Sequence, residues 1–185
     1  MAHSSAITRM KSEAVKHLLD CDMFVAALGA KEIKDKVDLV GTHIFTYPIN
    51  PDYMKEPCTF VIITTHIPKY RSDNPLFVHP KLIFQIVSHV KHMEIPTTEF
   101  KTSSNRNDFI SQIIDHLFNL EKTSKKQFGF FGQLDLVTNE EGYINKDWTY
   151  RTMVFDTLDL DKALCCCDTK EFFGKYGYPV PEGLI

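Results

Sequence analysis

The stretch that most constrains the fold is a predicted β-hairpin over residues 132–157. Three residues at alternate positions are expected to share one face of its first strand: Leu134, Leu136 and Thr138. The run Asn139–Gly142 (NEEG) then supplies residue types that favour a turn. The second half, from Trp148 to Val154, alternates aromatic and β-branched side chains. Such side chains favour a strand that returns beside the first.

The segment Ser104–Asn119, upstream of the hairpin, predicts an amphipathic helix. Its apolar residues recur at helical spacing and form one stripe: Phe109, Ile110, Ile113, Ile114, Leu117 and Phe118. Such a stripe needs an apolar surface to cover. We therefore expect a helix packed on a hairpin at the centre of the fold.

Two further helices are predicted near the N-terminus. Ser4–Leu19 carries an apolar face, with Ser4 or Ser5 placed to cap its start. A short second helix follows, capped by Asp20 or Asp22 and ended by Gly29.

Three more strands are predicted before the central helix. His43–Tyr47 is short and is stopped by prolines. Cys58–Ile67 is apolar on both faces, which is typical of a strand inside a sheet. Leu82–Val90 alternates, with four residues expected to face inward: Leu82, Phe84, Ile86 and Val90.

Composition describes a folded chain of 185 residues with 43% hydrophobic and 24% charged residues, long enough for one core. The net charge of −3 and the absence of a Lys/Arg block argue against sequence-independent binding of nucleic acid. No apolar run approaches the roughly 20 residues that cross a bilayer. The N-terminus lacks the apolar core of a signal peptide, so we expect a protein that is made and kept in the cytosol or that leaves it by a route other than secretion.

The five cysteines predict reduced thiols, because their number is odd and their spacing fits no disulfide framework. Three are consecutive, Cys165, Cys166 and Cys167, while Cys21 and Cys58 are isolated. No CxxC pair accompanies them, which argues against a zinc site.

The histidines and aspartates form no recognisable catalytic pattern. His89 and His92 lack an acidic partner at a metal-binding spacing, and His43, His66 and His79 are single. The aspartates after the last strand are more typical of a solvated edge than of a cation loop: Asp156, Asp159 and Asp161. We therefore expect no enzyme activity, no cofactor and no bound metal.

Two segments are long or apolar enough to contact another subunit. Pro68–Lys81 exceeds an ordinary hairpin loop, and is either an arm or a surface loop. The C-terminal segment carries aromatic residues among glycines and prolines, and docks on its own chain or on a neighbour. The residues predicted to lie at a subunit interface are Lys69, Tyr70, Arg71, Phe77, Phe172, Phe173, Tyr176 and Tyr178.

This organisation resembles the tail-terminator and related neck proteins of tailed bacteriophages. The pieces that carry the resemblance are the helix opened by Asn107-Asp108 and ended by Leu117-Phe118-Asn119, the strand Gly132–Val137 and the last strand Tyr150–Phe155. With the two middle strands they cover most of residues 5–160. The cysteine run and the aromatic C-terminal segment have no counterpart in the resemblance.

The resemblance implies an α+β fold with a mostly antiparallel sheet, packed on one face by helices, in a domain of residues 1–160. Residues 161–185 would be a C-terminal extension or arm. It further implies a ring of copies, commonly a hexamer, at the head-proximal end of the tail tube. This ring would stop tube polymerisation, contact the tail tube protein and the head-closure or connector proteins, and let DNA pass through its lumen. The protein would be assembled in the host cytoplasm into the virion, with no membrane partner.

Three alternatives remain open from the sequence. One is a head-completion or head-closure neck protein bound to the connector. Another is a small cytosolic metal-dependent hydrolase or nuclease that uses His89, His92 and the aspartates. A third is a module that binds a peptide or protein at an exposed sheet edge.

Overall fold

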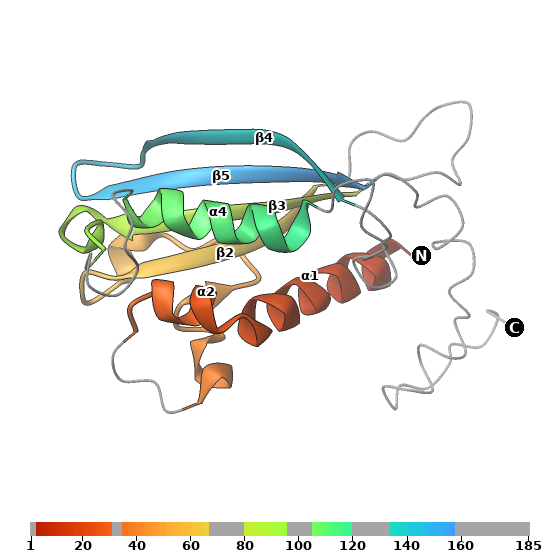
Figure 1. The fold of residues 1–185 in the computed structure, drawn as a ribbon, viewed down its shortest axis with the longest axis horizontal. Coiled ribbons are helices and arrows are strands. Elements are labelled where there is room, and N and C mark those ends of the chain that lie inside the picture. The colour runs from red at the N-terminus through yellow and green to blue at the C-terminus, as the bar shows by residue number, and fades with distance from the viewer. Residues whose placement is uncertain (1–2, 31–34, 67–79, 96–104, 120–133, 158–185) are drawn as a thin grey trace, which may run out of the picture.

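The computed structural model describes residues 3–30, 35–66, 80–95, 105–119 and 134–157, and the side chains from residue 7 onward. One five-stranded sheet with helices on it forms the fold, so the predicted α+β class is confirmed (Figure 1). The elements in chain order are α1 (His3–Asp20), α2 (Asp22–Ala27), η1 (Lys36–Leu39), β1 (Ile44–Phe45), η2 (Pro51–Tyr53), β2 (Thr59–His66), β3 (Lys81–His89), η3 (Val90–His92), α4 (Arg106–Phe118), β4 (Leu134–Tyr143) and β5 (Trp148–Thr157).

The strands lie in the order β1-β2-β3-β5-β4. β1 pairs with β2 in parallel, and every other pair is antiparallel, which confirms the mostly antiparallel prediction. β2, apolar on both faces, is an interior strand as expected. The register sets two ends of the sheet. Thr59, His89 and Trp148 lie at the end that we call the hairpin end, while His66, Lys81 and Thr157 lie at the far end.

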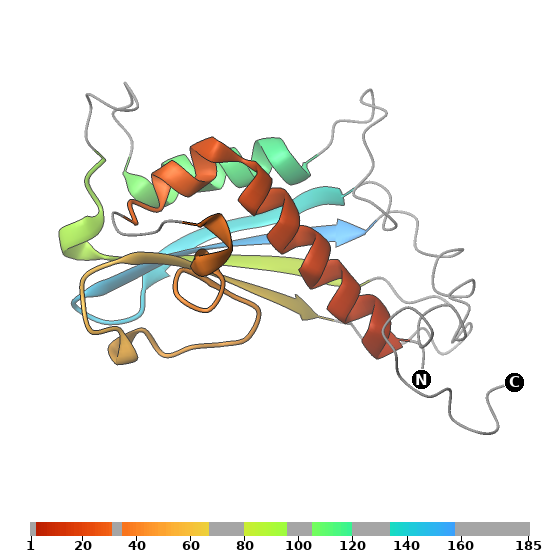
Figure 2. The same cartoon turned by 90° about the horizontal axis from the view of Figure 1, so that it is seen from below.

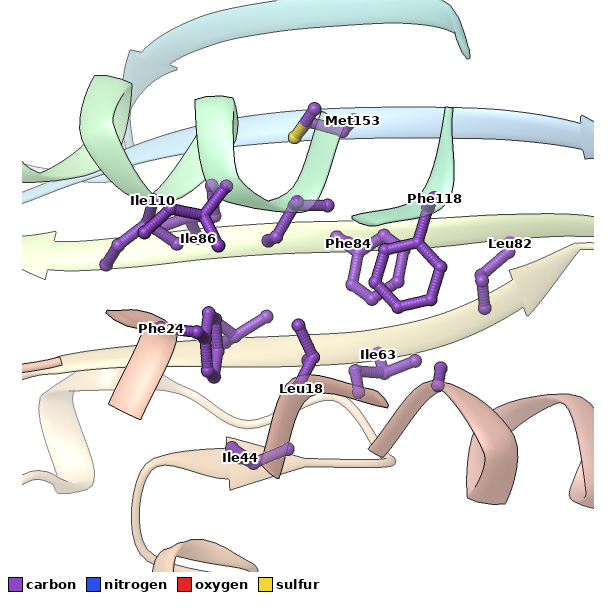
Figure 3. Close-up of a cluster of buried hydrophobic side chains, with 14 of the residues drawn as sticks. Leu18, Phe24, Ile44, Ile63, Leu82, Phe84, Ile86, Ile110, Phe118 and Met153 are labelled. Carbon is purple, nitrogen blue, oxygen red and sulfur yellow. The ribbon is translucent and has the colours of Figure 1, made fainter. Parts of the chain in front are cut away.

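The main core lies between the sheet and its helices. α2 and α4 lie on one side of the sheet, and the loop that carries η2 lies on the other (Figure 2). The stripe of α4 is buried as predicted through Ile110, Ile113, Ile114 and Phe118. The rings of Phe84 and Phe118 lie beside each other, with 4.7 Å between their centroids (Figure 3). The ring of Phe155 lies 5.7 Å from that of Phe84. These three rings are fully buried and form an aromatic cluster within the core.

A smaller cluster fills the other face of the sheet near the hairpin end. Its buried members are Phe45, Phe60, Ile62, Val87 and Trp148. Phe60 contacts both Phe45 and Trp148 edge-on, at 5.6 and 5.7 Å between ring centroids. Ile49 and Met54, from the loop between β1 and β2, cover this cluster. Each sheet face thus has its own apolar cluster, and only one of them is covered by helices.

The predicted hairpin forms, but its predicted turn was wrong. Asn139–Gly142 lies inside β4, and the chain reverses at residues 144–147. There the Oδ1 of Asn145 accepts hydrogen bonds from the backbone N–H groups of Asp147 and Trp148, at 2.9 and 3.1 Å. Gly142 instead pairs with Tyr150, whose hydroxyl would lie 2.8 Å from a Cβ at Gly142. The glycine therefore gives room to a cross-strand aromatic ring rather than forming a turn.

A β-bulge corrects a second prediction about β4. The register shifts between Leu136 and Thr138, so Thr138 lies opposite Val154 rather than on the face of Leu134 and Leu136. Val90 was also predicted to face inward, and this was wrong. It begins η3 after β3 has ended, and its side chain is 41% exposed.

Helix boundaries confirm the predicted stop and contradict the predicted caps. Gly29 follows α2 with a φ of 68°, a left-handed conformation that favours glycine. α1 begins at His3, so Ser4 and Ser5 lie inside it. The N-cap of α2 is Cys21, which makes no capping bond with its side chain, and Asp22 is the first helical residue.

Candidate interaction surface

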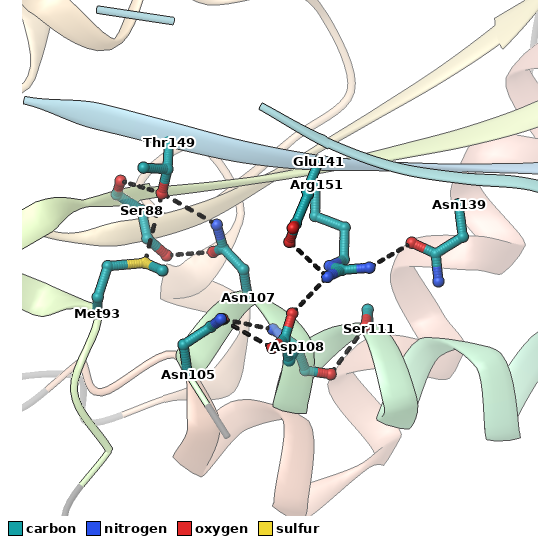
Figure 4. Close-up of polar contacts among 10 residues, drawn as sticks. All are labelled: Ser88, Met93, Asn105, Asn107, Asp108, Ser111, Asn139, Glu141, Thr149 and Arg151. Carbon is teal, nitrogen blue, oxygen red and sulfur yellow. Dashed lines mark hydrogen bonds and ion pairs between the residues drawn. The ribbon is translucent and has the colours of Figure 1, made fainter. Parts of the chain in front are cut away.

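A buried polar network joins the strands to the start of α4 at the hairpin end (Figure 4). The Oγ of Ser88 donates to Oδ1 of Asn107 at 2.6 Å and lies 2.8 Å from Oγ1 of Thr59. Because the proton of Ser88 is committed to Asn107, the hydroxyl of Thr59 donates to Ser88. Thr59 then accepts from Nδ1 of His92, 2.9 Å away. The network holds η3 against β2, and so fixes one wall of this end of the molecule.

Arg151 makes a second polar connection, between β4, β5 and α4. Its guanidinium lies 2.5 Å from Oδ1 of Asp108 and 2.7 Å from Oε2 of Glu141, and it donates to Oδ1 of Asn139 at 2.9 Å (Figure 4). The Nε of Arg151 is buried without a hydrogen-bond partner. Asn105 caps α4 by accepting from the backbone N–H of Asp108 at 2.9 Å. These contacts hold the second half of β4 to the helix.

Arg106 fixes the end of α2 next to this network. Its guanidinium is buried and donates to the carbonyl oxygens of Ala27, His92 and Glu94, at 2.5, 2.7 and 3.0 Å. A Cβ at Gly29 would lie 2.8 Å from Nη1 of Arg106 and 3.0 Å from Cε1 of His92. Gly29 is therefore required both for its backbone conformation and for this close approach.

Exposed apolar side chains gather around the hairpin end. Tyr53 and Tyr143 are 78% and 80% exposed, and Val90 and Ile144 are also exposed. Their segments are joined directly, because Asn145 donates to Asp52 at 3.0 Å and the N–H of Val90 donates to the carbonyl of Asp147 at 2.9 Å. We call Tyr53, Val90, Tyr143 and Ile144 the hairpin-end patch. Tyrosines in such a patch are typical of protein interfaces.

A second exposed apolar group lies on α2 and η1, which an ion pair between Asp22 and Lys36 holds together. Its members are Met23, Val37 and Val40. The carboxylate of Asp22 and the ammonium of Lys36 bond each other, which lowers the pKa of Asp22 and raises that of Lys36.

A cavity of about 700 Å³ lies among the segments that carry these two groups. Its lining comes from four places in the chain: the end of α2, the turn before β1, the loop before β2, and η3. The lining residues are Gly29, Ala30, Thr42, His43, Met54, Lys55, Glu56, Pro57, Cys58 and His92. This volume is within the range of about 300–1,000 Å³ that is typical of ligand and peptide pockets.

Two titratable groups in the cavity favour their neutral forms. Burial lowers the pKa of His43, which disfavours its imidazolium. Burial, together with the nearby charge of Glu56, raises the pKa of the Cys58 thiol to about 11. A thiol that stays protonated is a poor nucleophile. The cavity wall therefore suits an uncharged, partly aromatic occupant better than an anion or a reacting carbonyl.

The exposed edge of the sheet is partly closed. β4 is the longer of the two edge strands, β1 being the other, and at its start Asn119 bridges Leu134 and accepts from the N–H of Leu136 through its Oδ1 at 3.4 Å. Glu140 and Glu141 lie exposed along the rest of this strand. A bulge and charges on an edge strand disfavour pairing with a second strand.

The structure does not bring the predicted metal candidates together. His89 packs edge-on against Trp148 at 5.0 Å between ring centroids, while His92 bonds Thr59. Asp156 lies 3.7 Å from Lys81, and Asp159 and Asp161 lie outside the described residues, as do His79 and Cys165–Cys167. Within the described ranges, no group of three or more His, Cys, Asp or Glu side chains could hold a metal ion. Cys21 and Cys58 are both free thiols, as predicted.

All the predicted interface residues lie outside the described residues. They belong to segments 67–79 and 158–185. The hairpin-end patch was not predicted, because Tyr53 and Tyr143 are isolated in the sequence and show no periodicity. The one available signal was the tyrosine content of segments that also contain turn residues.

The comparisons with known proteins identify a family. A family model described as YomW matches residues 12–157, which include every described strand and the second half of α1. The chain belongs to the YomW family. YomW is a phage-associated family, so this chain is a phage-associated protein. No curated protein and no solved structure matches the chain. In the part of the chain that the structure describes, no helix is both long and apolar enough to span a bilayer.

Proposed function

We propose that this protein is a structural component of the phage particle, a tail terminator that forms a ring at the head-proximal end of the tail tube. The observation that supports the proposal best is the gathering of exposed apolar side chains around the cavity at the hairpin end, in a phage-associated family. Exposed apolar patches of this kind commonly mark sites of protein–protein contact. The ring would stop tube growth and join the tail to the neck.

A ring requires two different surfaces on each copy. In a cyclic assembly beyond a dimer, one patch of a subunit meets a different patch of the next, and the ring closes if the rotation allows it. The hairpin-end patch is one such surface, and it lies at one end of an elongated sheet. The second surface would come from the far end, where the chain continues beyond Thr157.

Inactivating the gene in the phage tests this role. We expect lysates in which heads and tails are not joined and in which tail tubes vary in length beyond the normal value, as electron microscopy can measure. Unjoined tails of normal length, beside heads that have lost their DNA, would favour the head-closure role instead. Complete particles with normal tails would contradict both.

A further inference from the structure

The walls of the cavity at the hairpin end indicate what kind of group would fit there. Met54, Pro57 and Ala30 offer apolar contact, and His43 and His92 offer imidazole rings. Methionine sulfur and imidazole rings both pack well against aromatic rings. A volume of about 700 Å³ is enough for more than one side chain. The matching occupant is therefore a short peptide with aromatic anchors.

The C-terminal part of this same chain has that composition. Residues 172–178 read FFGKYGY, so two phenylalanines and two tyrosines are separated by Gly174 and Gly177. Glycine allows backbone conformations in which rings that are close in sequence point to the same side. Large aromatic side chains in pockets commonly supply most of the binding energy of an interface.

The position at which the described chain ends favours a neighbouring copy as the source. β5 runs from Trp148 at the hairpin end to Thr157 at the far end, about 30 Å away for ten residues. The fifteen residues from Leu158 to Phe172 reach at most about 50 Å. To fill the cavity of its own chain, the segment would have to return about 30 Å along the whole sheet, which is within its reach only if these residues run largely extended beside the domain. A neighbour whose hairpin end lies near Thr157 meets the segment directly.

We propose that residues 172–178 of one copy fill the cavity between α2, η2 and η3 of the next copy. This inference rests on the proposed ring and identifies its contact. The cavity and the C-terminal segment lie at opposite ends of each subunit, so the contact is heterologous and can propagate around a circle.

Photo-crosslinking in the full-length protein tests the contact. The variant Phe173→benzoylphenylalanine is made in normal and in ¹⁵N-labelled form, and the two are mixed, reassembled and irradiated. We expect crosslinks from position 173 to peptides containing residues 54–58 or His92, with about half of them joining a labelled to an unlabelled chain. The same probe at Val137, which is exposed on β4, serves as the control and should not reach these peptides.

Two variants sharpen the test without changing the folded domain. Phe172→Ala with Phe173→Ala removes the anchors, and Lys55→Trp places a ring in the cavity from an exposed loop residue. Each should raise the protein concentration needed for half-assembly at least tenfold, while the midpoint of thermal unfolding of the dissociated chain stays unchanged.

Different failures have different meanings. Rings that form normally in both variants, with crosslinks elsewhere, would overturn this contact and leave the proposed function standing. Crosslinks only within one chain would overturn the contact between copies. The absence of any assembly in the unmodified protein would overturn the ring itself.

Discussion

The two ends of the helix-covered face differ in character. At the far end, Phe84, Phe118 and Phe155 pack without polar partners and are fully buried. At the hairpin end, the same face holds the hydrogen-bonded network of Ser88 and Asn107, and a cavity lies beside it. Tyr53 and Tyr143, the most exposed large apolar side chains among the described residues, both lie at this second end. The comparison indicates that the buried aromatic cluster at the far end contributes most to the stability of the fold. Binding of another protein is expected at the hairpin end, where the polar network lies beside the cavity.

The largest expected change in the free energy of unfolding comes from the aromatic cluster at the far end. Phe84→Ala should lower the free energy of unfolding by about 3–5 kcal/mol, because it removes a fully buried ring that touches Phe118 and Phe155. Urea denaturation measures the loss. The control is Val154→Ala, which changes a half-buried side chain on the sheet face that carries no helices. It should lower the free energy of unfolding by less than about 1 kcal/mol. Equal losses of unfolding free energy in the two variants would contradict the special contribution of the aromatic cluster to stability.

A smaller effect is expected in the polar network. Ser88→Ala would remove the acceptor of the Thr59 hydroxyl proton and the donor to Oδ1 of Asn107 in a buried place, which should cost about 1–3 kcal/mol. Ser12→Ala is the matched control, since its hydroxyl bonds the carbonyl of Thr8 on the exposed side of α1. Its unfolding free energy should change by less than about 0.5 kcal/mol. A neutral Ser88→Ala would show that the network does not hold the hairpin end.

The smallest effect concerns pH. Because burial lowers the pKa of His43 in the folded protein, the unfolded chain binds a proton at this residue more readily than the folded one. The contribution of neutral His43 to the free energy of unfolding is therefore fully present above the pKa of histidine in the unfolded chain, about 6.5. It decreases as the pH falls below that value. His43→Gln should remove this part of the pH dependence, as unfolding midpoints between pH 5 and 8 would reveal. Parallel curves for the two proteins would contradict the burial of a neutral His43.

Much of the fold could be predicted because the spacing of apolar residues along the sequence indicates which side chains are buried. The stripe of α4 and the alternation of β3 each have one apolar face, so the predicted and observed elements agree. The turn could not be placed, because NEEG has turn-forming residues and the deciding contact is the ring of Tyr150 over Gly142. The bulge at Val137 has no sequence signal of its own, yet it moves Thr138 to the other face.

The candidate surface was much less predictable than the fold. Its polar network joins Thr59, Ser88 and Asn107, which are far apart in the chain and show no shared motif. The cavity needs four separate segments to meet. The division into a domain of residues 1–160 and an extension of residues 161–185 stays a prediction, as does the role of the interface residues in segments outside the described ranges.

The mass of the purified full-length protein in solution tests the central claim most directly. Native mass spectrometry, with sedimentation as a check, should show a closed oligomer of one size, commonly six copies, in the absence of other phage proteins. The double variant Tyr53→Ser and Tyr143→Ser, which alters only exposed side chains of the hairpin-end patch, should dissociate it while keeping the unfolding temperature. A protein that stays monomeric at its highest soluble concentration, or a double variant that assembles as well as the original, would contradict the account.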